Sequence, residues 1–150
     1  MNGIIEKITI YPEKGAAGTE LAEARLIENL GLEGDFHATG GERQLSLLFA
    51  EDRKLLAEQE EEGKRSESGL CFSRFRENIS IRFHGSDPLR PGMRLETGAA
   101  LLEITGETKR CHEECSLFQA GKPCLLAGRS LFAKVLKSGI IRIGNSVRTS

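Results

Sequence analysis

Short apolar or alternating stretches, separated by glycine-containing turns, make up most of the chain. Stretches of this length bounded by Gly, Pro and Asn are typical of β-strands. The strands predicted in this way cover residues 3–11, 44–49, 78–83, 93–96, 100–105, 131–137, 140–143 and 146–148. The pattern at 93–105 predicts a hairpin around Thr97-Gly98, and Gly139 and Gly144 mark turns near the C-terminus. Residues 21–29 fit a short helix or a strand.

One helix is predicted, over residues 50–61. Its first turn is acidic, which suits the positive end of the helix dipole, and Leu55 and Leu56 lie near its middle. Residues 13–19 and the glycine-rich stretch 31–41 are predicted loops, and residues 87–92 a turn. The pattern predicts a mainly β fold of the α+β class, a small closed and mostly antiparallel β-barrel with one or two peripheral helices. A length of 150 residues suits a single domain with one core.

Composition narrows the classes of function. The net charge is −1, so bulk electrostatics gives no reason to expect a nucleic acid partner. The N-terminus lacks the basic-then-apolar order of a signal peptide, and no apolar run approaches the roughly 20 residues of a membrane span. We therefore expect a cytoplasmic protein, with no membrane association, whose thiols stay reduced. Residues 51–62 carry six acidic residues against two basic ones, and the last third is basic, a distribution that favours a small anionic ligand at the C-terminal side.

Three of the four cysteines lie within fourteen residues, at Cys111, Cys115 and Cys124. Lys109, Arg110 and His112 lie close to Cys111 in the sequence. Neighbouring cations lower the pKa of a thiol, and the thiolate is the form that attacks sulfur or binds a metal. This pattern predicts a nucleophilic or sulfur-carrying thiol at Cys111, with the other two cysteines as accessory thiols nearby.

Two other interpretations of the cysteines stay open. Three thiolates and one histidine would form a tetrahedral structural zinc site. Because His112 is the sequence neighbour of Cys111, His37 or His84 would have to complete that set from across the fold. Alternatively, the cysteines are small buried hydrophobic residues, as we expect for Cys71 between Leu70 and Phe72.

Two further polar clusters are candidates for ligand binding. The loop at 31–44 contains Asp35, His37, Glu42 and Arg43, which would suit a polar heterocycle or a phosphate, or would cap turns in a tight β-connection. The stretch 74–79 contains two arginines followed by a Glu-Asn pair. Guanidinium groups there would clamp an anion, or would only form a solvated edge.

The order of these segments resembles the MOSC domain, a family named for the C-terminal domain of molybdenum cofactor sulfurases. The resemblance extends from about Gly3 to Val147 and implies a β-barrel, and the extra cysteines resemble those of small, stand-alone bacterial members. The segments that carry it are Gly31-Leu32-Glu33-Gly34-Asp35-x-His37, Gly41-x-Arg43-Gln44, Glu77-Asn78-Ile79, Cys111-His112, and Leu131-Phe132-Ala133-x-Val135-Leu136 with Gly139 and Gly144. Arg76 and Asn145 depart from the family pattern, which commonly has Gly and Asp there.

The resemblance implies a role in molybdenum cofactor chemistry. Cys111 matches the family's recurrent cysteine, thought to carry a persulfide received from a pyridoxal-phosphate-dependent desulfurase. Some relatives bind the molybdopterin cofactor and reduce N-hydroxylated compounds, so sulfur transfer and cofactor-dependent activity both stay open. Catalytic residues would be Cys111 and His112. Cofactor-binding residues would be Asp35, His37, Arg43, Arg76, Glu77, Asn78 and Lys109.

The expected partners are a cysteine desulfurase and a molybdoenzyme or a protein of molybdenum cofactor biosynthesis. Any pyridoxal phosphate would belong to the partner, because 150 residues cannot hold both domains. Two alternatives to a sulfur carrier are a module that binds and delivers molybdopterin without covalent chemistry, and a Cys-rich barrel with a structural zinc.

Overall fold

The described part of the protein is built almost entirely of β-strands. The computed structural model describes residues 2–13, 15–41, 43–51, 77–84, 89–106 and 131–149. The strands are β1 (Asn2–Ile10), β2 (Thr19–Leu21), β3 (Glu23–Ile27), β4 (Gly31–Leu32), β5 (Leu45–Phe49), β6 (Ile79–His84), β7 (Arg94–Thr97), β8 (Ala100–Gly106), β9 (Leu131–Lys137), β10 (Gly139–Arg142) and β11 (Ser146–Thr149). Within these ranges no helix has the length and apolar character of a membrane span.

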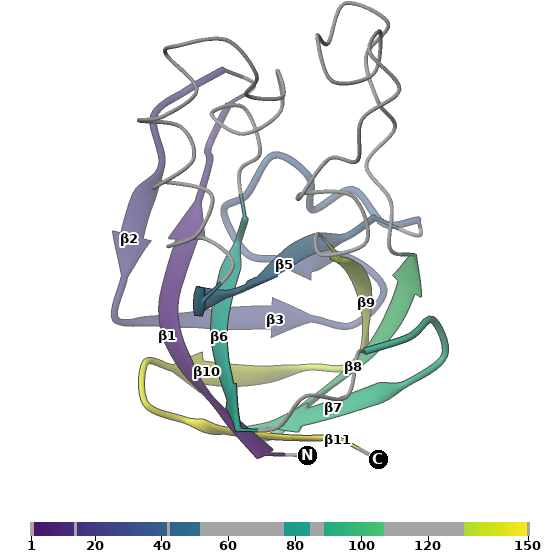
Figure 1. The fold of residues 1–150 in the computed structure, drawn as a ribbon. Coiled ribbons are helices and arrows are strands. Elements are labelled where there is room, and N and C mark those ends of the chain that lie inside the picture. The colour runs from purple at the N-terminus through teal and green to yellow at the C-terminus, as the bar shows by residue number, and fades with distance from the viewer. Residues whose placement is uncertain are drawn as a thin grey trace, which may run out of the picture.

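The larger sheet closes on itself. Its strand order is β11-β7-β8-β9-β5-β6-β1-β2, and an additional pairing between β11 and β1 makes a seven-stranded barrel with β2 outside it (Figure 1). The pairings are antiparallel except between β5 and β6, which run parallel. A second sheet has the order β10-β3-β4. The prediction of a closed, mostly antiparallel β-barrel is confirmed.

Alternation of side chains along the strands produces the core. In β8 and β9 every second residue is buried, and these residues, such as Leu102 and Val135, belong to one hydrophobic cluster. The turn between β7 and β8 needs glycine at Gly98, whose φ is +56° and where a Cβ atom would lie 2.6 Å from the carbonyl oxygen of Ile140. Hydrophobic alternation and one tight turn therefore suffice to specify this side of the barrel.

The structure resolves the ambiguity at residues 21–29 in favour of a strand, β3. Its alternate residues Ala24 and Leu26 are buried, and its neighbours are β10 and β4. The predicted loop at 31–41 consists mainly of turns, but its first two residues form β4. The predicted helix at 50–61 is helical at residues 50 and 51, and the rest of it lies outside the described residues.

One buried hydroxyl in the described barrel lacks a hydrogen-bond partner. Thr97, at the end of β7, is 3% exposed, and its Oγ1 is unpaired. We expect Thr97→Val to raise the free energy of unfolding by about 1 kcal/mol, because it replaces an unsatisfied hydroxyl with a methyl group of similar shape. Urea denaturation of both proteins measures this difference. Thr97→Ser, which keeps the hydroxyl and loses the methyl group, is the matched control and should be destabilised. A Val variant less stable than the wild type would show that the hydroxyl contributes to stability.

Candidate functional site

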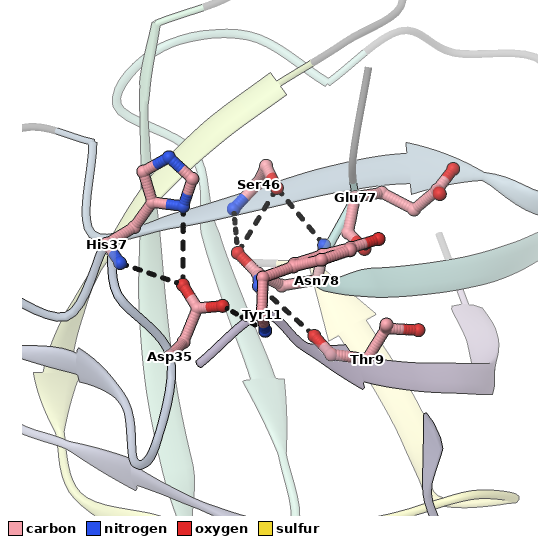
Figure 2. A network of polar contacts seen from close by, with 7 residues as sticks. All are labelled: Thr9, Tyr11, Asp35, His37, Ser46, Glu77 and Asn78. Carbon is pink, nitrogen blue, oxygen red and sulfur yellow. Dashed lines mark hydrogen bonds and ion pairs between the residues drawn. The ribbon is translucent and has the colours of Figure 1, made fainter. Parts of the chain in front are cut away.

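A buried carboxylate organises the loop that follows β4. The Asp35 side chain is 0% exposed, and its Oδ1 accepts a hydrogen bond of 2.8 Å from the backbone N–H of Tyr11 (Figure 2). Its Oδ2 accepts one of 3.1 Å from the backbone N–H of His37 and lies 3.4 Å from His37 Nδ1. The His37 side chain, in contrast, is 45% exposed. The loop therefore contains a buried acid and presents a half-exposed imidazole beside it.

Local backbone geometry fixes this arrangement. Gly34 has a φ of +90°, a conformation that favours glycine, and reverses the chain just before Asp35. The N–H of Phe36 then donates to the carbonyl oxygen of Tyr11 at 2.9 Å, which attaches the loop to the end of β1. The rings of Phe36 and His37 lie 3.8 Å apart between centroids, tilted by 38°. Together these contacts hold the imidazole in one place.

The hydrogen bonds keep the Asp35 carboxylate ionised. Burial acts to raise the pKa of Asp35, because a charge is poorly solvated in the interior. The hydrogen bonds from the His37 side chain and from the backbone N–H groups of Tyr11 and His37 act in the opposite direction and prevail, so the pKa lies below its ordinary value. The site therefore contains a fixed negative charge.

The hydrogen bonds around Asp35 form one node of the site, and those around Asn78, just before β6, form a second. The side-chain Oδ1 of Asn78 accepts hydrogen bonds from the N–H and the Oγ of Ser46, at 3.0 and 3.1 Å, and its Nδ2 donates to the carbonyl oxygen of Thr9 at 3.1 Å. Asn78 is 1% exposed. These bonds join β1, β5 and β6 at one end of the barrel. The ligand contact predicted for Asn78 is not tested by this geometry and stays a prediction.

Tyr11 connects the two nodes. Its N–H binds Asp35, and its hydroxyl donates to the carbonyl oxygen of Glu77 at 3.3 Å, next to Asn78 (Figure 2). Four of the predicted residues, Asp35, His37, Glu77 and Asn78, are thus brought together. Sequence reasoning missed Tyr11, Thr9 and Ser46, although Tyr11 is the chain's single tyrosine and Ser46 interrupts an apolar run.

Arg43 lies just before β5 and contacts Phe132 of the neighbouring strand β9. Its guanidinium carbon lies 4.9 Å from the ring centroid of Phe132, and Phe132 is the register partner of Ser46. The next residue, Gln44, is buried and joins the loop to β9, because its Oε1 accepts a 2.9 Å hydrogen bond from the N–H of Val135. The exposed Arg43 cation is therefore one strand pairing away from the Ser46–Asn78 node.

The sequence of the chain matches a known domain family. The sequence profile of the MOSC domain matches residues 33–148, which include both nodes of the site. The chain belongs to the MOSC domain family. No curated protein sequence matches the chain significantly.

Solved structures resemble this MOSC domain along its whole length. YuaD from Bacillus subtilis is 17% identical with a TM-score of 0.71, over 99% of this chain and 96% of that protein. YiiM from Escherichia coli is 19% identical with a TM-score of 0.62, over 100% and 70% of the two chains. YiiM from Geobacillus stearothermophilus is 15% identical with a TM-score of 0.56, over 99% and 73%. At these identities the likeness supports the fold alone.

Several residues predicted for the MOSC site lie outside the described part of the chain. They are Cys111, His112, Lys109, Arg76, Cys115 and Cys124. Cys71, predicted to be a core residue, also lies outside the described part. Their predicted roles stay predictions. Within the described ranges no three His, Cys, Asp or Glu side chains gather in a way that would hold a metal ion.

Proposed function

We propose that this MOSC domain carries sulfur as a persulfide on Cys111 and passes it to the molybdenum cofactor, which is its acceptor substrate. Membership of the family supports a role in that chemistry. The observation on this chain that carries the proposal is the register of β5, β8 and β9, because these strands fix the two points from which the cysteine-containing segment 107–130 departs.

Both of those points lie beside the polar network. Gly106, the last residue of β8, pairs with Phe132, and Phe132 pairs with Ser46 of the Asn78 node. Leu131, the first residue of β9, pairs with Leu47, the neighbour of Ser46. Cys111 follows Gly106 by five residues, so chain connectivity alone keeps the two Cα atoms within about 18 Å of each other. This length of chain would let a thiol at Cys111 reach the end of the barrel that contains the site.

One round of the proposed transfer balances without an external reductant, and a cellular thiol would reduce the resulting disulfide before the next round. The Cys111 thiolate attacks the outer sulfur of a persulfide on the desulfurase, a Cys111 persulfide forms, and the donor thiolate leaves. A second thiol, Cys115 or Cys124, then attacks the inner sulfur of the Cys111 persulfide. A disulfide forms, and the outer sulfur leaves as sulfide for the acceptor. Lys109 or His112 would stabilise the thiolate.

The donors that the structure describes fit a ligand with a phosphate and a polar ring. The Arg43 guanidinium is exposed and is held against Phe132, so it is available for two-pronged hydrogen bonds to a phosphate. The half-exposed His37 imidazole would meet a polar ring edge. The Asp35 side chain is buried and would act through His37. Arg76, Lys109 and Glu77 remain predicted contacts.

Intact mass measurement tests the proposal. The protein is incubated with cysteine, pyridoxal phosphate and a generic cysteine desulfurase, and its mass is recorded with and without reductant. We expect a reductant-sensitive gain of about one sulfur atom, because an activated thiolate accepts sulfur readily. Cys111→Ser should abolish the gain, whereas Cys71→Ser, as matched control, should retain it. A gain that persists in Cys111→Ser would overturn the assignment.

A failure to gain mass would point to a different function. No gain in the wild type, with its thiols shown to be free, would favour a module that binds and delivers molybdopterin without covalent chemistry. Titration of the wild type and of Arg43→Ala with molybdopterin would then measure the affinity that the guanidinium supplies. About one zinc per chain in protein purified without chelator would instead support the structural zinc interpretation.

A further inference from the structure

We propose that His37 is the proton acceptor of this site, that Nε2 is the acting atom, and that Asp35 is the positioning residue. The substrate class that this assignment fits carries a weakly acidic S–H, N–H or O–H group. The reaction to which we attach it rests on the proposed function, whereas the state of the imidazole rests on the described contacts alone.

The polar contact of the His37 ring lies at its Nδ1 edge. Nδ1 faces the Asp35 carboxylate at 3.4 Å, and the second ring nitrogen lies on the far side of the ring from Asp35 (Figure 2). Within the described residues Nε2 has no hydrogen-bond partner. The Phe36 ring lies 3.8 Å from the imidazole between centroids, tilted by 38°. The imidazole therefore directs one nitrogen toward the buried carboxylate and the other away from it (Figure 2).

The buried carboxylate determines which ring nitrogen of His37 carries the proton. Asp35 is ionised and accepts hydrogen bonds only, so the nitrogen that faces it must carry a proton. The neutral imidazole therefore has its proton on Nδ1, and the lone pair of Nε2 is left to accept a proton from a substrate. Among the described residues, Asp35 is the one ionisable group in contact with the ring. The same division of labour, with an acid that orients a histidine and a free Nε2 that takes the proton, is how a histidine base is held in the Ser-His-Asp triad.

A purely structural ion pair would have a different geometry. A histidine that only stabilises a buried acid gains most when it is itself buried, because exposed ion pairs contribute little. Here the acid is fully buried, but the imidazole is 45% exposed. The Asp35 carboxylate also has two backbone N–H donors already. The ring therefore helps to keep Asp35 ionised while almost half of it faces solvent.

In the proposed sulfur transfer the proton balance is simple. The S–H bond of a thiol presented at this end of the barrel breaks, and its proton goes to His37 Nε2. The thiolate attacks the outer sulfur of the donor persulfide, and the donor thiolate that leaves takes the proton back. No electrons are exchanged with any other group, and the imidazole returns to its neutral form.

Nitrogen NMR of histidine-labelled protein tests the state of the ring without any reaction. The chain has three histidines, and the signals of His37 are those that disappear in His37→Gln. We expect the neutral His37 ring to carry its proton on Nδ1. In Asp35→Asn the amide can donate to Nδ1, so the proton should move to Nε2 in a fraction of the molecules. A wild-type ring protonated on Nε2 would overturn the proposal, even if the Asn variant fails to fold.

Kinetics of sulfur loading test the role of the base. We expect His37→Gln and His37→Ala to load sulfur about 100-fold more slowly than the wild type, within the usual range for a lost general base. Added imidazole should restore part of the rate in His37→Ala, which a merely structural role would not allow. Glu33→Gln, an exposed acid of the same loop, is the matched control and should load normally.

The two proposals fail separately. A wild-type loading rate in His37→Gln at every pH would overturn the base and leave the sulfur carrier standing. No loading in the wild type would overturn the sulfur carrier, and the NMR spectrum would still decide between a ring that presents a free Nε2 and one that does not.

Discussion

Asn78→Ala is expected to lower the free energy of unfolding by about 3 kcal/mol, because buried polar groups would lose their partners. The Asn78 amide accepts from the N–H and Oγ of Ser46 and donates to the carbonyl oxygen of Thr9, and all three residues are buried. Alanine would leave those groups in the interior with fewer hydrogen bonds. Chemical denaturation of the two proteins, analysed with a common slope, measures the loss.

Two further variants locate the origin of that loss. Asn78→Asp keeps an acceptor for Ser46 but cannot donate to Thr9 and buries a charge, so it should also be destabilised. Asn145→Ala is the matched control, because Asn145 accepts a 2.8 Å hydrogen bond from the N–H of Arg142 in an exposed turn. It should lose less than about 1 kcal/mol. A loss this small in Asn78→Ala would contradict the view that this residue holds three strands together.

The second large effect concerns Asp35. Asp35→Asn should lower the free energy of unfolding by about 2 kcal/mol at neutral pH, because an amide is a weaker acceptor than a carboxylate for the N–H groups of Tyr11 and His37. Chemical denaturation at neutral pH measures this loss. Glu23→Gln is the matched control, because Glu23 pairs with Arg142 on the surface, where side-chain ion pairs contribute little.

The pH dependence of this difference has a definite sign. The pKa of Asp35 is lower in the folded protein than its ordinary value of 3.8. Its contribution to stability is therefore complete above that ordinary value and is lost as the pH falls through the folded pKa. The gap between wild type and Asp35→Asn should be wide at neutral pH and narrow under strongly acidic conditions. A gap that widens on acidification would show that the carboxylate is not stabilised by folding.

The barrel was predictable from the sequence because the patterns that specify its strands and turns are local. Alternation at β8 and β9, and a glycine turn at Gly98, each involve a few consecutive residues and specify strands whatever their partners are. The ambiguity at 21–29 had a different origin. The strand β3 contains Glu23, Ala24 and Arg25, which do not distinguish a strand from a helix, and its pairing with β10 comes from a segment more than 100 residues later.

The site was predictable only in part, for the same physical reason. The sequence predicted a ligand-binding role for Asp35 and His37, because these polar residues lie in a glycine-rich loop. The contact of Asp35 with the backbone of Tyr11 joins residues 24 positions apart, and that of Asn78 with Thr9 joins residues 69 positions apart. The partner atoms are backbone groups, which leave no signature in the sequence. Ser46 lies in an apolar strand, so its hydroxyl had no predicted role.

The seam between β1 and β11 also governs when the barrel can form. Asn2 pairs with Arg148, so the first and last of the described strands close the sheet, and the N and C ends drawn in Figure 1 lie at the same end of the barrel. During synthesis the edge of β1 at Asn2–Ile4 stays unpaired until β11 has left the ribosome. Such a closure is a contact of the highest sequence separation, which slows folding and prolongs the exposure of a strand edge to other chains. The barrel is therefore most vulnerable to aggregation just before its final strand arrives.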